Sequence, residues 1–220
     1  MAKTHATLRL RQLHIPLNVG CNALTPFNNE NMRNLVLNAK HWHLFVLSFG
    51  IPFILQMIMV ARIMSKAIDN EDLLPTSLFS DSIVLIIITG IFYAILPLWM
   101  WIVATGLQHK VPENIKLKVN KFKVFFILPM IYFVLYMTLF FPSIMNFDVE
   151  PTLFLIIVPL HFFAMFCMLY CLYFVAKTIK TVELQRVVHS SDYIGEFFLI
   201  WFFPIGVWFI QPRINKVVQQ

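Results

Sequence analysis

Four long apolar stretches constrain this chain more than any other feature. They occupy residues 42–63, 83–107, 124–144 and 153–175, and each is long enough to cross a hydrocarbon core of about 30 Å as a helix. Backbone inside lipid must satisfy its own N–H and C=O groups, which favours helices. Only 13% of the 220 residues are charged, against about 25% in soluble domains. The sequence therefore predicts an all-α integral membrane protein built as a four-helix bundle.

A fifth apolar stretch, residues 197–210, does not fit this pattern. As a helix its 14 residues would reach only about 21 Å, and Pro204 and Gly206 should break or kink it. Trp201 and Trp208 suit the level of the lipid headgroups. We expect a bent re-entrant or interfacial helix on the cytoplasmic side. A tilted fifth span in a locally thinned bilayer is the alternative.

The distribution of Lys and Arg predicts the orientation in the membrane. Of the 17 such residues, 15 fall before the first span, after the second span or after the fourth. The other two, Arg62 and Lys66, lie on the opposite side together with six of the 11 acidic residues. Short loops rich in Lys and Arg stay in the cytoplasm. We therefore expect a multi-pass protein of the cell inner membrane with both termini cytoplasmic.

These boundaries divide the chain into three parts. Residues 1–41 form a basic cytoplasmic arm and a lead-in helix with its N-cap at Asn28 or Asn29, residues 42–175 form the membrane domain, and residues 176–220 form a cytoplasmic-side tail. The arm itself has two readings: a flexible segment attracted to lipid headgroups, or a docking arm for a soluble partner. No cleavable signal peptide is expected, because the first 40 residues lack an apolar core region.

Two polar side chains within the expected spans are candidate functional residues. Ionisable groups inside a membrane often mark function, and His161 is the clearest such group here. Gln56 carries a side-chain amide well inside the first expected span. His161 could be a proton carrier or ligand contact, hydrogen-bonded to Gln56 or Tyr136. The favoured reading is a neutral, structural histidine bonded to a backbone group or a hydroxyl, since no acid accompanies it within a span.

The sequence contains no recognisable catalytic motif. The His41-Trp42-His43 segment resembles a fragment of a histidine box, but di-iron enzymes need many such ligands on several helices. A nucleophile elbow, a zinc-protease motif and a phosphate-binding glycine loop are all missing from the sequence. We expect no enzyme activity, no metal and no cofactor.

The prolines support a different hypothesis. Pro52, Pro97, Pro129 and Pro159 place a proline in every expected span, and proline removes a helical hydrogen bond and can create a hinge. A small transporter or channel is therefore the alternative function. A pore would require a homo-oligomer, because one such subunit has too few polar residues to line it.

The expected partners are the lipid bilayer and a cytoplasmic protein. The contact surface for that protein is a basic face on the cytoplasmic side, made up of Arg9, Arg11, Lys116, Lys118 and Lys121. Membrane orientation already explains the net charge of +6, so direct nucleic-acid binding is not expected.

The tail also carries a resemblance. The segment Phe203–Asn215, FPIGVWFIQPRIN, resembles the ending of small bacterial multi-span proteins, and Pro204, Trp208 and Arg213 within it are candidate functional residues. The four-span architecture with cytoplasmic termini is similar to the accessory membrane protein found beside type VI-B RNA-guided ribonucleases. That resemblance implies modulation of the ribonuclease or of a bacterial defence response, without catalysis. A membrane-embedded lipid-modifying enzyme using cytoplasmic-face histidines is the third hypothesis.

Overall fold

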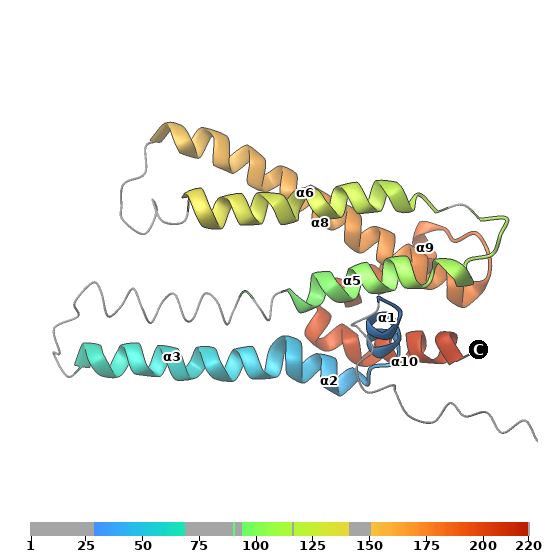
Figure 1. Ribbon diagram of the computed structural model, residues 1–220, viewed down its shortest axis with the longest axis horizontal. Helices are drawn as coiled ribbons and strands as arrows, with labels where there is room; N and C mark the ends of the chain where they lie inside the picture. The colour runs from blue at the N-terminus through green and yellow to red at the C-terminus, as the bar shows by residue number, and fades with distance from the viewer. Residues whose placement is uncertain (1–28, 69–89, 91–93, 116, 141–150, 220) are drawn as a thin grey trace, which may run out of the picture.

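A computed structural model describes residues 29–68, 90, 94–115, 117–140 and 151–219, and the regular elements in these ranges are helices (Figure 1). The α-helices are α1 (Asn29–Leu37), α2 (His41–Phe45), α3 (Ile51–Ile68), α5 (Ile95–Gly106), α6 (Val119–Leu135), α8 (Pro151–Leu184), α9 (Ser190–Trp201) and α10 (Phe203–Gln219). The shorter elements are two π-helical turns, η1 (Val46–Gly50) and η3 (Tyr136–Phe140), and a 3-10 turn, η2 (Gln108–Lys110). For this part of the chain the all-α prediction is confirmed.

Three helices are long and apolar enough to cross a membrane. They are His41–Arg62, Val119–Phe140 and Thr152–Leu184, and they correspond to the first, third and fourth predicted spans. Of the second predicted span, 83–107, residues 83–89 and 91–93 lie outside the described residues, and α5 is its described helix. The four-span arrangement therefore stays a prediction, and three helices of membrane-spanning character are established.

These helices carry the apolar surface expected against lipid. Large side chains on α3, α6 and the first half of α8 are exposed, among them Phe53, Ile54, Ile131, Val134, Leu155 and Phe166. Soluble monomers rarely expose apolar patches of more than a few hundred Å². The exposed side chains on three helices make a bilayer the fitting environment.

Helix α8 runs further than the predicted span. It continues without a break to Leu184, about 51 Å at 1.5 Å per residue, whereas the prediction ended the span at residue 175. Its first half exposes its apolar side chains, but Cys171, Val175, Ala176 and Ile179 in its second half are buried. One helix thus provides both an exposed apolar half within a stretch long enough to cross a membrane and the central support of the structure at its far end.

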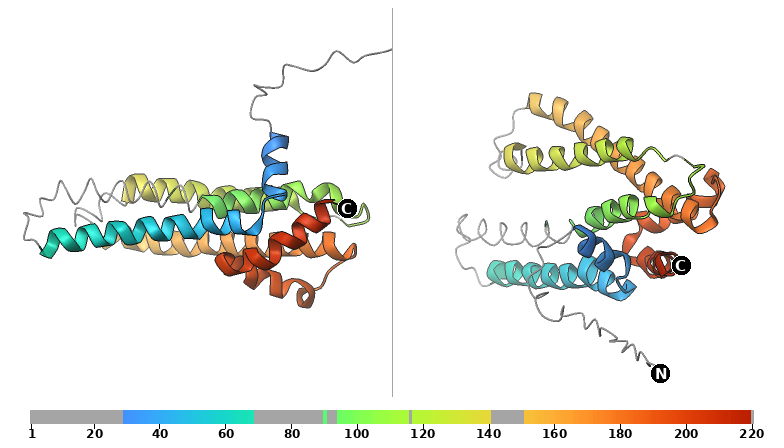
Figure 2. Two further views of the ribbon diagram at one scale, coloured as in Figure 1. Left: turned by 90° about the horizontal axis from the view of Figure 1, so that it is seen from below. Right: turned by 45° about the vertical axis from the view of Figure 1, so that its right-hand side comes forward.

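That end is closed by α1, α9 and α10, which we call the cap. In Figure 1 these helices gather at the end of the bundle where α2 and α3 begin and α8 finishes. Figure 2 shows α1 standing across the direction of the long helices. The cap packs on a continuous core that also includes Trp99, Val103 and Phe122 from α5 and α6.

The lead-in helix begins near the predicted position but does not feed straight into the first span. Helix α1 ends at Leu37, and residues 38–40 separate it from α2. The first span then contains the π-turn η1, which ends two residues before Pro52, a residue that cannot donate a backbone hydrogen bond. The change of direction after Leu37 lets α1 lie across the bundle.

The tail is bent, as predicted, and takes the form of a helical hairpin. Helix α9 ends at Trp201, Phe202 leaves helical geometry, and α10 begins at Phe203. Pro204 lies in the first turn of α10, where a missing N–H is tolerated. Residues 197–210 therefore do not form the single straight helix that a tilted fifth span requires.

We predict that Gly206 is essential for this hairpin. A Cβ atom at Gly206 would lie 1.7 Å from the Leu199 carbonyl oxygen, so α9 and α10 would have to separate. We expect Gly206→Ala to lower stability by about 3 kcal/mol and Tm by roughly 6 °C or more, measured by thermal unfolding of the detergent-purified chain.

Gly195→Ala is the matched control. Gly195 lies within α9, and a Cβ there meets nothing within 4 Å, so alanine should raise stability by about 0.5–1 kcal/mol through helix propensity. Equal Tm values for Gly206→Ala and the wild type would contradict the close approach.

Candidate functional site

A buried glutamine joins three helices at the centre of the cap end. Gln211 on α10 is 0% exposed, and its Oε1 accepts a 2.9 Å hydrogen bond from Nε1–H of Trp99 on α5. Its Nε2 donates to the Val36 carbonyl of α1 at 3.1 Å and to Oδ1 of Asn215 at 2.9 Å. A buried amide is costly unless it is hydrogen-bonded in this way. The network therefore specifies how α1, α5 and α10 meet.

Asn215 extends this network to the residues that follow α1. Its Nδ2 donates to the Ala39 carbonyl at 3.0 Å, one helical turn beyond Gln211 on the same face of α10. The last carbonyls of a helix have no partner within the helix. Side chains of α10 thus bond to the carbonyls of the last turn of α1 and to one just after it, and these bonds hold α1 across the bundle.

Arg213, a predicted candidate, belongs to a second polar cluster. Glu196 on α9 is 5% exposed, and its Oε1 lies 2.8 Å from Nη1 of Arg213 and 3.1 Å from Nζ of Lys180. Lys180 also pairs with Glu183 at 2.8 Å. The cluster joins α8, α9 and α10, so in this structure Arg213 pairs within the hairpin.

The first turn of α9 has its own charged contact. The backbone N–H of His189 donates to Oδ2 of Asp192 at 2.9 Å, and Nη2 of Arg186 lies 3.1 Å from Oδ1. The His189 hydrogen bond, followed by the Arg186 guanidinium, lowers the pKa of the Asp192 carboxyl. The contribution of Asp192 to stability is therefore complete above the ordinary carboxyl pKa and is lost as the pH falls through the lowered value.

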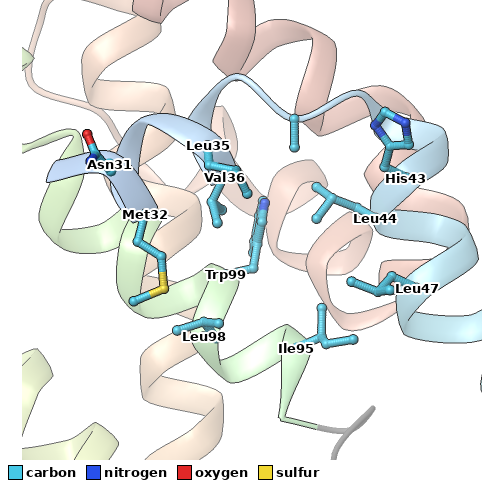
Figure 3. Close-up of a pocket in the computed structure, with 11 residues that line it drawn as sticks. Asn31, Met32, Leu35, Val36, His43, Leu44, Leu47, Ile95, Leu98 and Trp99 are labelled. Carbon is cyan, nitrogen blue, oxygen red and sulfur yellow. The ribbon is translucent and has the colours of Figure 1, made fainter. Parts of the chain in front are cut away.

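A large apolar hollow lies beneath α1. It has a volume of about 800 Å³, within the range of small-molecule sites. Figure 3 shows side chains of α1, α2, η1 and α5 converging on it, with Asn31 and His43 towards opposite ends. The apolar lining residues are Met32, Leu35, Val36, Ala39, Leu44, Leu47, Ile95, Leu98 and Trp99.

A second, basic hollow adjoins the first. It has a volume of about 420 Å³ and shares the lining residues Met32 and Leu98 with the apolar one. Its remaining lining residues are Arg33, Trp101, Ile102, Thr105 and Lys123. We call the two hollows together the α1 groove, and it runs from an apolar end to a basic end.

Two predicted candidates, Gln56 and Pro204, meet at a third hollow. This hollow, about 390 Å³, lies between the first span and the start of α10 and is also lined by Ser48 and Trp201. The buried Oγ of Ser48 has no hydrogen-bond partner there. No sequence pattern predicts that these residues share a site.

His161 has a different partner from those predicted. Its Nδ1 lies 3.1 Å from the hydroxyl of Tyr132 on α6, and neither Gln56 nor Tyr136 is its partner. Tyr132 lies one helical turn before Tyr136, on the same face of α6. The geometry matches the reading of a histidine bonded to a hydroxyl, and a role for His161 in function stays a prediction.

Trp208 packs against the start of the first span. Its ring centroid lies 4.7 Å from that of His41 and 5.6 Å from that of Phe45. Trp208 and His41 thus form a contact between α10 and α2.

The described residues contain no group of three or more His, Cys, Asp or Glu side chains placed to hold a metal.

The basic face is described in part. Lys118 and Lys121 are exposed at the beginning of α6, and Nζ of Lys121 lies 5.3 Å from the ring centroid of Tyr170. Arg9, Arg11 and Lys116 lie outside the described residues. The structure therefore places two of the five predicted contact residues together.

Sequence reasoning missed four residues that organise this end: Gln211, Asn215, Glu196 and Arg33. The first two are four residues apart, a spacing that puts both on one helix face. This spacing was a usable signal for α10. Their partners, on α1 and just after it, are about 175 positions away in the chain, so no local pattern could have identified them.

We predict that the Gln211 network sets the stability of the cap. Gln211→Leu leaves the Trp99 N–H without an acceptor and removes the side-chain hydrogen bonds to the Val36 and Leu37 carbonyls. It should cost about 2 kcal/mol, or roughly 4–8 °C in Tm. The measurement is thermal unfolding in detergent, with the exposed Gln219→Leu as control.

A double variant tests the pairing itself. Trp99→Phe and Gln211→Leu together should cost less than the sum of the two single changes, because neither partner is left unpaired. Strict additivity would argue against a Trp99–Gln211 hydrogen bond.

Comparison with known proteins identifies no relative of this chain. No protein-family model, no curated protein and no solved structure matches it. The resemblance of the tail to bacterial accessory membrane proteins therefore stays a prediction from the sequence. Function has to be argued from the chain's own residues.

Proposed function

We propose that this protein is a non-enzymatic, multi-pass membrane protein that acts as an accessory or regulator through its cap end. The observation that carries the proposal is the combination of a rigid cap with exposed basic side chains beside it. The cap is held by the buried Gln211 and Glu196 clusters, while Lys118 and Lys121 remain exposed at the start of α6. A rigid charged surface at the end of a membrane bundle suits docking of a protein.

The proposed placement has four spans, including residues 83–107, with the cap and both termini on the cytoplasmic side of the inner membrane. Two features support it. The segments that carry Lys110, Lys118 and Lys180 lie at the cap end, whereas α3 carries Arg62 towards the opposite end (Figure 1). This asymmetry is the one that the positive-inside rule describes.

In this placement the α9–α10 hairpin dips its turn into the cytoplasmic leaflet. The turn exposes Phe202 by 59% and Ile205 by 65%, and Trp201 and Phe209 beside it are also exposed. The other ends of the two helices are polar, with Ser190 and Asp192 on α9 and Lys216 on α10. An apolar turn with polar ends fits a re-entrant element better than a surface loop in water.

The proposed partner is a cytoplasmic protein with an acidic surface that docks on Lys118 and Lys121, with Arg9, Arg11 and Lys116 as neighbouring contributors. In the setting to which the tail's resemblance points, this partner would belong to a bacterial defence system. The protein would then position or regulate an enzyme at the membrane while carrying no catalysis itself.

The placement predicts the side on which single cysteines react. In a background with Cys21, Cys167 and Cys171 replaced by alanine, Gln219→Cys should react with a membrane-impermeant maleimide only after permeabilisation. Ser65→Cys, at the other end of α3, should react in intact cells. Labelling of Gln219→Cys from outside intact cells would refute the cytoplasmic C-terminus.

The docking proposal predicts a charge-dependent interaction. A partner captured by cross-linking in cells should be identified, purified and titrated against the full-length protein. Lys118→Gln with Lys121→Gln should weaken binding by roughly three- to tenfold, and the difference should shrink at high salt.

Arg62→Gln with Lys66→Gln is the charge-matched control on the opposite side of the membrane. It should leave binding unchanged. Equal affinity of the wild type and the Lys118/Lys121 variant for every identified partner would remove this face as the docking surface.

A further inference from the structure

The α1 groove combines two kinds of surface that rarely adjoin by accident. Its larger hollow is lined by aliphatic and aromatic side chains, and its smaller hollow contains two cationic side chains, Arg33 and Lys123. Met32 and Leu98 line both, so the apolar and basic parts are continuous. No acidic residue is among the described residues that line either hollow. The groove therefore suits an amphipathic molecule with a negative charge at one end.

The two cations have no partner within the described part of the chain. Among the described residues, Arg33 and Lys123 form no ion pair or hydrogen bond, whereas Lys110, Lys180 and Arg213 are each bound to carbonyl or carboxylate oxygens. A cation beside an apolar surface that is not paired by the described residues is available to an external anion. Their positions on α1 and α6 let them approach that anion from two sides.

Packing directs Arg33 into the basic hollow. A Cβ atom at Gly106 would meet Cγ and Cδ of Arg33 at 3.1 Å, so the aliphatic stem of Arg33 passes close over this glycine of α5. A long side chain laid along an apolar surface keeps its charged end at the polar edge. Trp101, which lines the same hollow, is a residue type typical of the membrane–water interface.

We propose that the α1 groove binds one anionic phospholipid of the cytoplasmic leaflet. The phosphate lies between Arg33 and Lys123, and an acyl chain occupies the apolar hollow beneath α1. The proposal rests on the membrane placement above, which sets this end at the cytoplasmic interface, and it is independent of the docking partner. Basic pockets between membrane helices on the cytoplasmic side are typical sites for acidic lipid headgroups.

An anionic phospholipid fits better than the other amphipathic ligands. A zwitterionic lipid would bring its own ammonium group towards two cations and lose much of the attraction. A free phosphate would leave the 800 Å³ apolar hollow without a ligand. Because the lipid would contact α1, α2 and α5 at once, its binding would also stabilise the position of α1.

The first experiment compares phosphatidylglycerol with phosphatidylcholine of identical acyl chains. The detergent-purified full-length protein is titrated with each lipid, and retained lipid is counted by native mass spectrometry. We expect one phosphatidylglycerol per chain and a clear preference over phosphatidylcholine. Arg33→Gln with Lys123→Gln should lower affinity for phosphatidylglycerol by about 25-fold, or about fivefold for each cation.

The variants are chosen to keep the fold. Glutamine retains the Cγ and Cδ atoms with which Arg33 covers Gly106, and Lys123 is exposed, so Lys123→Gln alone remains informative if the double variant is unstable. Lys40→Gln with Lys216→Gln removes the same charge from exposed positions outside the groove and should leave affinity unchanged. Arg33→Lys should retain most of the binding because it keeps the charge.

The second experiment locates the acyl chain. With Trp42, Trp201 and Trp208 replaced by phenylalanine, the remaining tryptophans are Trp99 and Trp101, one lining each hollow. Phosphatidylglycerol with brominated acyl chains should quench their fluorescence at sub-stoichiometric lipid in micelles. Excess inorganic phosphate should not reverse the quenching.

Three outcomes would overturn the proposal: equal retention of the two lipids, equal affinity of the wild type and the Arg33/Lys123 variant for phosphatidylglycerol, or reversal of quenching by inorganic phosphate alone. None of them would bear on the side of the membrane at which Gln219→Cys reacts. Failure of the lipid site is therefore distinguishable from failure of the proposed placement.

Discussion

The arrangement of this protein depends on one buried amide. Gln211 is enclosed by apolar side chains, and each of its polar atoms must find a partner there or cost several kcal/mol. It finds these partners on Trp99, Val36 and Asn215, so its hydrogen bonds require one particular arrangement of α5, α1 and α10. Apolar packing tolerates sliding and rotation, whereas this set of directional bonds does not. The position of α1, and with it the groove beneath α1, follows from that requirement.

The second constraint is the length of α8. A helix of about 51 Å exceeds a hydrocarbon core of about 30 Å, so it cannot be a membrane span alone. Its first half exposes apolar side chains, as a membrane span would, and its buried second half supports the cap. Because the same rigid helix serves both, the cap is fixed relative to the bundle. The Glu196 cluster adds the hairpin to that support through Lys180.

These constraints explain which polar residues remain available for function. Arg213 and Asn215, although conspicuous in the tail, satisfy other groups within the protein. His161 is bonded to Tyr132. Arg33 and Lys123 in the groove, and Lys118 at the start of α6, are among the cations that have no carboxylate partner within the part of the chain that the structure describes. The proposed lipid site and docking surface use these residues, and they are separate, so one can be changed without the other.

The sequence by itself determined the helical class, the membrane-spanning character of the first, third and fourth stretches and the bend in the tail. Each of these depends on local properties: run length, the absence of charge, and the effects of proline and glycine on one helix. Gln211 and Asn215 were not predicted to organise the cap, although their four-residue spacing places them on one face of a helix. Only the tertiary structure decided that α1 crosses the bundle and that Gln56 and Pro204 share a hollow. It also decided that His161 pairs with Tyr132. In the same way, it brought Arg33 and Lys123 to one site. These contacts join side chains that are far apart in the chain. They are selected because buried polar groups need hydrogen-bond partners in specific directions, and no local sequence pattern records that need.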